Sequence, residues 1–385
     1  MERLSIAIMG LALAGCFPSP KDAGEVESTE SDGEASGTAS GGATADGETQ
    51  TDGEPSASDV EWTLELDPGF SVLRMIRTPA GVLVALQGDP SVPMASSEVR
   101  EYSSSMDLLW SAPLPNAGIG DLEDLGGGEF LAVGVSGESG AYVPTAWRLS
   151  CCAAAVSQAY PQDPGADFAW AAAAELRGDG ILLVIGRNED GLEVAELVQI
   201  PLALSPPTSV DVLPTWVRGA ARTPDGNVLL LGDGGDIDMF YEVGPGGVTE
   251  GFGFGGDIGM VGKGDELTLV EFGEDEVSLQ PYGEEAWVQV PIPGFAGYYD
   301  EFVLDRHTRV GLVHREEDPT GPLVLSEFGD DGVVVRTLAL PHQQYDYASA
   351  RAIAVGEDDA IYLAVGESQP GGGRVEFLHR IAPLE

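Results

Sequence analysis

The chain has 385 residues, and its 64 Asp and Glu residues outnumber 18 Lys and Arg residues, which gives a formal net charge of −46 at pH 7. Phosphate backbones are bound by clustered cations, so this charge excludes nucleic acid as a partner and instead favours solubility. The 53 glycines and 26 prolines favour a turn-rich, all-β protein, and the 43% of hydrophobic residues is enough for a sizeable core.

The first fifteen residues predict an export signal. The run from Leu4 to Gly15 is apolar but too short to span a bilayer. It ends in Leu13-Ala14-Gly15-Cys16, which resembles the lipobox of bacterial lipoproteins. In such a motif, small residues let the backbone lie extended in a signal peptidase, and the cysteine thiol takes a diacylglyceryl group. The resemblance implies cleavage before Cys16 and a nearly permanent lipid anchor to the membrane. The alternative is an ordinary signal peptide with a chance cysteine at its end.

The next segment, residues 16–59, is a low-complexity mixture of Gly, Ser, Thr, Ala, Glu and Asp. After Phe17 it contains no aromatic residue, and Lys21 is its only cation. Such a composition cannot bury enough apolar surface to offset the entropy of ordering, so we expect a disordered acidic tether. Phe17 rather than Asp follows Cys16, which by resemblance to lipoproteins of enteric-type bacteria favours anchoring in the outer membrane. The sequence therefore predicts an exported protein of the bacterial cell envelope.

Residues 60–385 contain a unit that recurs seven times. Its clearest copy, residues 220–232, has an apolar strand, the turn Pro224-Asp225-Gly226, and a second, very apolar strand. In each unit a third and a fourth strand follow, with a more alternating pattern that suits the exposed side of a sheet. The units are about 40 to 50 residues long, which is the size of a four-stranded propeller blade. One first strand, Asp167–Leu176, is rich in alanine and favours helix by propensity, but the register of the repeat predicts a strand.

The two ends of the repeat region predict closure into a ring. The last unit ends after its third strand, residues 374–381, whereas a spare strand, residues 60–66, stands at the start. This spare strand resembles the fourth strand of the first unit, residues 109–114. We therefore expect residues 60–66 to complete the seventh blade, which removes an open sheet edge. The fold class predicted is all-β, a seven-bladed β-propeller; an open solenoid and two β-sandwiches are the alternatives.

These units resemble the repeats of bacterial seven-bladed propellers of the WD, NHL and quinoprotein-like architecture. The resemblance covers residues 60–385, but the Gly-His and Trp-Asp signature of true WD repeats is absent. It therefore implies a shape and no particular activity.

Motifs of catalysis and of metal binding are scarce. The histidines, which stand outside zinc-binding spacings, are His307, His314, His342 and His379. A Gly-x-Gly-x-x-Gly match at Gly251, Gly253 and Gly256 lies between β units, so we interpret it as a turn rather than a nucleotide site. No cofactor and no metal ion are expected. Cys151 and Cys152 are adjacent, between the third and fourth strands of the second unit, and are predicted either to form a vicinal disulfide or to remain two thiols.

The loops that join one blade to the next are the best candidates for ligand binding, because aromatic rings mixed with a few polar groups suit sugar or peptide recognition. The candidate residues are Trp216, Arg218, Tyr298, Tyr299, Asp300, His342, Tyr345, Asp346 and Tyr347. The competing interpretation is that these aromatics cap the inner strands and pack between blades.

Three functions follow from this sequence. The first is a membrane-anchored, non-catalytic binding module with a monomeric head that recognises an envelope protein or glycan. The second is an extracytoplasmic lyase or glycosidase that uses carboxylates and Tyr residues in the propeller channel, for which paired carboxylates in a cleft are the signature. The third is an assembly scaffold, which requires a large exposed apolar patch.

Overall fold

The computed structural model describes residues 59–67, 69–88, 97–138, 141–151, 156–160, 168–177, 180–189, 192–204, 208–233, 238–254, 257–273, 276–291, 299–304, 309–315, 323–329, 331–340, 347–368 and 374–384. The predicted signal peptide, Cys16 and nearly all of the predicted tether lie outside these residues. No helix in the described ranges is both long and apolar enough to cross a membrane.

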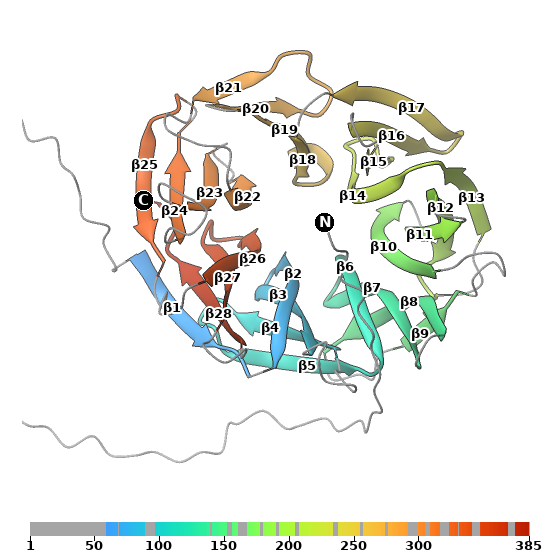
Figure 1. Cartoon of the computed structure of the whole chain (residues 1–385), viewed down its shortest axis with the longest axis horizontal. Helices are drawn as coiled ribbons and strands as arrows, with labels where there is room; N and C mark the ends of the chain where they lie inside the picture. Colours follow the sequence, from blue (N-terminus) through green and yellow to red (C-terminus); the bar gives the residue numbers. More distant parts are fainter. Residues whose placement is uncertain are drawn as a thin grey trace, which may run out of the picture.

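The described residues form seven four-stranded antiparallel sheets arranged as the blades of a ring, which confirms the predicted β-propeller (Figure 1). Blade one consists of β2 (Phe70–Thr78), β3 (Gly81–Gly88), β4 (Ser97–Ser103) and β5 (Leu108–Leu114). Blade two consists of β6 (Ala117–Gly126), β7 (Glu129–Glu138), β8 (Ala141–Ser150) and β9 (Val156–Ala159).

The next four blades follow in chain order. Blade three consists of β10 (Phe168–Arg177), β11 (Gly180–Glu189), β12 (Leu192–Pro201) and β13 (Thr208–Leu213). Blade four consists of β14 (Trp216–Arg222), β15 (Val228–Asp233), β16 (Asp238–Gly244) and β17 (Gly247–Phe254). Blade five consists of β18 (Asp257–Val261), β19 (Thr268–Phe272), β20 (Glu276–Pro281) and β21 (Val288–Pro291). Blade six consists of β22 (Tyr299–Leu304), β23 (Val310–Arg315), β24 (Leu323–Phe328) and β25 (Val334–Ala339). The alanine-rich segment is thus the strand β10, as the repeat register predicts.

Blade seven joins the two ends of the folded region. Its strands, from the inside outwards, are β26 (Tyr347–Val355), β27 (Ile361–Ser368), β28 (Arg374–Ile381) and β1 (Val60–Glu65). The antiparallel pairing of β1 with β28 is extended at its ends by hydrogen bonds from Leu66 N to Glu376 O and from Ala382 N to Asp59 O, both 2.9 Å. The predicted closure by the first strand is confirmed, and it leaves β28 with a partner on both edges.

The core lies between neighbouring blades, because the second strand of each blade is buried on both faces. In β3 every residue is buried. Val82, Val84 and Leu86 pack against blade seven, whereas Leu83 and Ala85 pack against blade two. Since successive side chains of a strand point to opposite faces, one continuous apolar strand supplies the contacts to both neighbours.

Six of the seven innermost strands contain a bulge in their pairing with the second strand. The register shifts occur in β2, β6, β10, β14, β22 and β26. In blade two the approach is so close that a Cβ on Gly134 would lie 1.9 Å from Gly118 O, which explains the glycine in the middle of β7. Bulges bend a strand and re-aim the side chains beside them. Asp121 directly follows the bulge in β6.

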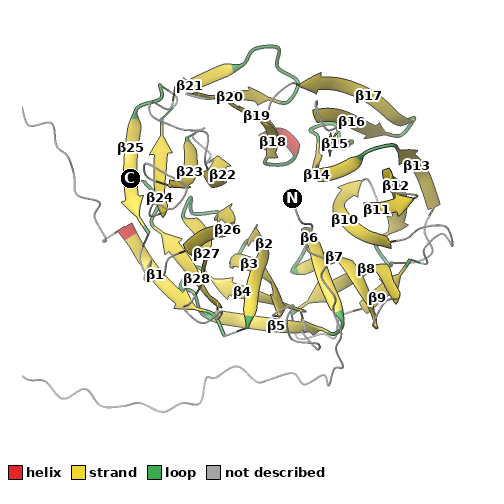
Figure 2. Ribbon diagram, in the orientation of Figure 1, coloured by secondary structure: helices red, strands yellow, loops and turns green. Residues whose placement is uncertain are grey.

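Blade five differs from these six blades at its inner edge. Its first strand, β18, has five residues and pairs with β19 in continuous register. A single 3-10 turn, η2 (Gly264–Glu266), follows it and lies on the inner side of the ring (Figure 2). We call the end of the ring at which the innermost strands begin the proximal end, and the end at which they finish the distal end. The turn that contains η2 is therefore at the distal end.

Candidate functional site

The predicted ligand residues belong to the proximal end of the ring. Trp216 is half-buried at the start of β14, and Arg218, on the same strand, forms an ion pair with Asp238 at the start of β16. Tyr299 and Asp300 begin β22, and Tyr347 begins β26. Only the backbone of these three residues belongs to the described part of the structure. The other predicted ligand residues lie outside the described residues: Tyr298, His342, Tyr345 and Asp346. The aromatic site at this end stays a prediction.

The adjacent cysteines also remain untested as a pair. Cys151 is exposed directly after β8, between the third and fourth strands of blade two. Cys152 lies outside the described residues, so the vicinal disulfide stays a prediction.

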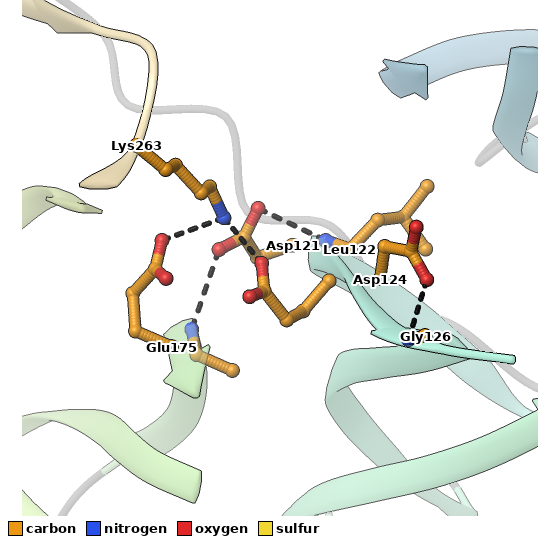
Figure 3. Close-up of polar contacts among 8 residues, drawn as sticks. Asp121, Leu122, Asp124, Gly126, Glu175 and Lys263 are labelled. Carbon is orange, nitrogen blue, oxygen red and sulfur yellow. Dashed lines mark hydrogen bonds and ion pairs between the residues drawn. The ribbon is translucent and has the colours of Figure 1, made fainter. Parts of the chain in front are cut away.

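A group of charged side chains that sequence reasoning did not single out lies on the axis of the ring. We call it the axial cluster: Asp121 and Glu123 from β6, Glu175 from β10, and Lys263 from the turn after β18. Lys263 Nζ donates to Glu123 Oε2 and lies 2.6 Å from Glu175 Oε1 (Figure 3). One lysine of blade five therefore ties together the innermost strands of blades two and three.

The carboxylates of the axial cluster are buried and held in place. The side chain of Glu123 is 5% exposed and that of Glu175 is 1% exposed, whereas Lys263 is 36% exposed. Asp121 accepts hydrogen bonds from the backbone N–H groups of Leu122 at 2.9 Å and Ala174 at 3.3 Å (Figure 3). Asp121 thus joins β6 to β10 through the backbone, while Lys263 joins the same two strands through their side chains.

Burial controls the protonation of this cluster. It raises the pKa of Glu175 to about 8, although the charge of Lys263 opposes this rise. It also raises the pKa values of Asp121 and Glu123, again against the effect of Lys263. Burial alone would lower the pKa of Lys263, but the surrounding carboxylates outweigh it and hold that pKa above its ordinary value. At neutral pH the lysine is charged and the cluster retains a carboxyl proton.

The folded domain should lose stability as the pH rises from about 5 to about 8. The pKa of a Glu side chain in the unfolded chain is about 4.3, whereas the pKa of Glu175 in the folded domain is about 8. Between these values the folded state binds more protons than the unfolded state, so raising the pH favours unfolding. Burial raises the pKa of Glu376 to about 7, which acts in the same direction. Urea unfolding midpoints across this pH range measure the effect, and Glu175→Gln should reduce the slope. A midpoint that rises with pH would contradict the expectation.

The axial cluster links the inner edges of three blades. Its acids face an internal cation, the ammonium of Lys263, and within the described residues no group of three or more His, Cys, Asp or Glu side chains has the geometry to hold a metal ion. An ion pair with buried carboxyl groups contributes mainly specificity of assembly, here the relative placement of three blades.

Beside the axial cluster, a depression of about 530 Å³ opens at the distal end of the ring. We call it the distal pocket. It is lined by Arg77 at the end of β2, by the turn between β14 and β15, and by the turn that contains η2: Arg77, Arg222, Thr223, Pro224, Gly226, Lys263, Gly264, Asp265 and Glu266. Blades one, four and five therefore contribute to it. Three of the chain's 18 Lys and Arg residues line this single pocket.

The cations of the distal pocket differ in their ion-pair partners. Arg77 Nη2 lies 3.1 Å from Glu266 Oε2, and both side chains are about half exposed, at 48% and 57%. Lys263 is held by the axial carboxylates. Arg222, in contrast, has no hydrogen bond or ion pair from its side chain to the part of the chain that the structure describes. An exposed ion pair contributes at most about 1 kcal/mol, so Arg77 is readily exchanged onto another anion.

Two comparisons with known sequences found nothing: no protein-family model matches the chain, and no curated protein does. Solved structures do share its fold. A puromycin hydrolase matches 82% of this chain at 13% identity, with a TM-score of 0.54. The acylaminoacyl peptidase of Pyrococcus horikoshii matches 78% at 9% identity, with a TM-score of 0.52. A puromycin-hydrolyzing peptidase of Mycobacterium tuberculosis matches 80% at 11% identity, with a TM-score of 0.51.

These likenesses define the class of protein, which is a β-propeller. The matches cover 54%, 49% and 50% of the three solved chains, so this chain spans about half the length of each. At such low identity the likeness concerns the fold alone, because one fold hosts many unrelated functions.

Proposed function

We propose that this protein is an exported bacterial lipoprotein, anchored through Cys16 to the outer membrane, whose propeller is a non-catalytic binding module for an envelope glycan or protein. The leader, residues 1–15, and the lipobox support export and lipidation. The acidic composition of residues 16–59 supports a flexible tether, and residues 60–385 form the head that it carries.

The distal pocket is the observation that carries the binding function. It is an open, mostly polar depression of about 530 Å³. It brings charged groups of blades one, four and five together at the distal end of the ring. It contains an arginine, Arg222, that has no intramolecular partner among the described residues.

The enzyme and scaffold alternatives are less well supported. A glycosidase needs two carboxyl groups that reach the substrate, whereas Glu123 and Glu175 are almost fully buried and both face Lys263. A scaffold needs one large apolar patch. The exposed large apolar side chains of the described residues are spread round the rim, on or directly beside the outer strands of six blades: Trp62, Leu108, Leu109, Val156, Val212, Val288, Val333, Val334 and Val335.

Replacing Cys16 by Ala should release the protein from the membrane. The thiol is the group that takes the lipid, so Cys16→Ala leaves no anchor. Expression in a bacterial host with radioactive palmitate, followed by separation of membrane and soluble fractions, measures both labelling and location. Cys151→Ala is the matched control and should remain labelled and membrane-bound. A Cys16→Ala chain that still incorporates palmitate would contradict the anchor.

The binding function is tested with the purified full-length Cys16→Ala chain. It is applied to an array of neutral and acidic oligosaccharides and, in parallel, immobilised and exposed to an envelope extract. Saturable retention of a defined glycan or envelope protein supports a binding module. Retention of neither class of ligand contradicts it, and release of shortened sugars from the array would establish the enzyme instead.

A further inference from the structure

We propose that the distal pocket binds the carboxylate of a small acidic sugar, and that the guanidinium of Arg222 makes the principal contact. This inference rests on the proposed binding function and names the chemical class of ligand for it. It follows from the charge of the pocket, from the charge of the whole chain, and from the polarity of the lining residues.

The two arginines of the pocket favour an anionic group, although Asp265 and Glu266 also line it. Arg222 lines the pocket without a described partner, and Arg77 is engaged only in an exposed pair with Glu266. A guanidinium has a planar fork of N–H donors that matches a carboxylate, and such bidentate pairs are among the strongest hydrogen bonds that proteins form. A ligand carboxylate at Arg222 would therefore gain a partner without displacing a buried one.

Lys263 has a positioning role in this site. Its ammonium is already bound to Glu123 and Glu175, so it does not act as a free cation for the ligand. Its interactions instead hold the turn that contains η2 against the axis of the ring. That turn supplies Asp265 and Glu266 to the lining of the pocket.

The charge of the whole chain limits how many negative charges the ligand carries. The net charge of −46 repels polyanions before they reach the pocket. Screening over about 8 Å at physiological ionic strength leaves the contact with Arg222 itself effective. Repulsion by the whole chain together with local attraction by Arg222 favours a ligand with one carboxylate over a highly charged polymer.

The polarity of the lining residues favours a sugar over an apolar ligand. Pro224 is the one apolar side chain among them apart from the glycines, and no aromatic ring is included. Asp265 and Glu266 add carboxylates to the lining, and carboxylate oxygens accept hydrogen bonds from the hydroxyls of a sugar ring. An apolar or aromatic ligand would find no matching surface here.

The experiment uses the full-length Cys16→Ala chain and three probes: D-galacturonate, D-galactose and inorganic phosphate. Isothermal titration should show saturable binding of galacturonate. Galactose should bind about tenfold or more weakly, because it lacks the carboxylate that forms the charge-assisted hydrogen bond. Phosphate should also bind about tenfold or more weakly, because it lacks the sugar hydroxyls. Arg222→Gln should weaken galacturonate by about tenfold or more, and Arg222→Lys should retain part of the affinity, because it keeps the charge but loses the fork.

Arg148→Gln is the matched control, because Arg148 is also a partly exposed arginine but lies on β8 of blade two, outside the residues that line the pocket, where it pairs with Glu129. It should leave galacturonate binding unchanged, and thermal melting of all variants checks that they fold. Equal affinity for phosphate and galacturonate would overturn the inference, as would a loss of binding in Arg148→Gln but not in Arg222→Gln. If galacturonate does not bind while another glycan of the array does, the inference fails and the proposed binding function stands.

Discussion

Replacing Lys263 by Met should lower the free energy of unfolding of the propeller by about 2 to 3 kcal/mol, because it leaves Glu123 and Glu175 buried without their cation. The expected loss is below the largest values known for buried pairs, since the lysine itself is 36% exposed. Urea unfolding at neutral pH measures it. The loss should be smaller at about pH 5, where carboxyl groups with raised pKa values keep their protons and need no cation.

Arg77→Met is the matched control for this prediction. It also removes a cation at the distal end of the ring, but its pair with Glu266 is exposed, so the loss should be below about 1 kcal/mol. Adding Glu175→Gln to Lys263→Met should restore part of the stability, because an uncharged amide does not need the cation. The effects of the two substitutions on the free energy of unfolding are therefore not additive. Equal losses for Lys263→Met and Arg77→Met would show that the axial cluster does not tie the blades together.

Deleting residues 60–65 should lower the melting temperature by on the order of 10 °C and make the protein associate. The deletion removes β1, so the edge of β28 loses a ladder of backbone hydrogen bonds, each of which contributes about 1 kcal/mol. The unpaired edge is then a template for another chain. Thermal melting and sedimentation at several protein concentrations measure the two effects.

The matched control for the β1 deletion is a deletion of the same length within the predicted tether, residues 40–45. It shortens the acidic segment but removes no strand of a blade, so the melting temperature and the sedimentation coefficient should match those of the full chain. A common melting temperature for the two deletions would mean that the ring does not depend on closure by its first strand.

Much of the fold could be predicted from sequence because the relevant signals are local. Each blade has an apolar second strand preceded by a turn, as in residues 220–232, and this pattern recurs along the chain. The register of the repeat was strong enough to override the helix propensity of the alanines in β10. The leftover first strand predicted the pairing of β1 with β28, although the two lie at opposite ends of the folded region.

The axial cluster could not be predicted because it depends on contacts between three blades. Lys263 and Glu123 are separated by 140 residues, so no local pattern relates them. Two signals were present but weak. Lys263 is the one lysine of residues 60–385, and Asp121 and Glu123 stand at alternate positions of an inner strand. Taken alone, Lys263 is equally compatible with a solvated turn, and the two acids with a solvated strand edge. Only the closed ring brings the three side chains close to one another.

Which end of the ring binds a ligand could not be predicted from the sequence either. Sequence reasoning placed the ligand among the aromatic residues of the proximal end because aromatics often mark binding surfaces. That site stays a prediction, whereas the described residues show a depression at the distal end that is lined by Arg77, Arg222 and Lys263. Which end of the ring presents a suitable pocket is a property of the closed arrangement and of no single unit.

The sequence by itself determined the number of blades and the strand that closes the ring, because short-range patterns of apolar and turn residues specify both of them. It also predicts an export signal and an acidic tether. Only the tertiary structure decided that Lys263 crosses the axis to two buried carboxylates, and that Arg222 faces a pocket without a described partner. The physical reason is that burial and charge pairing depend on distances between blades, and closure of the ring sets these distances.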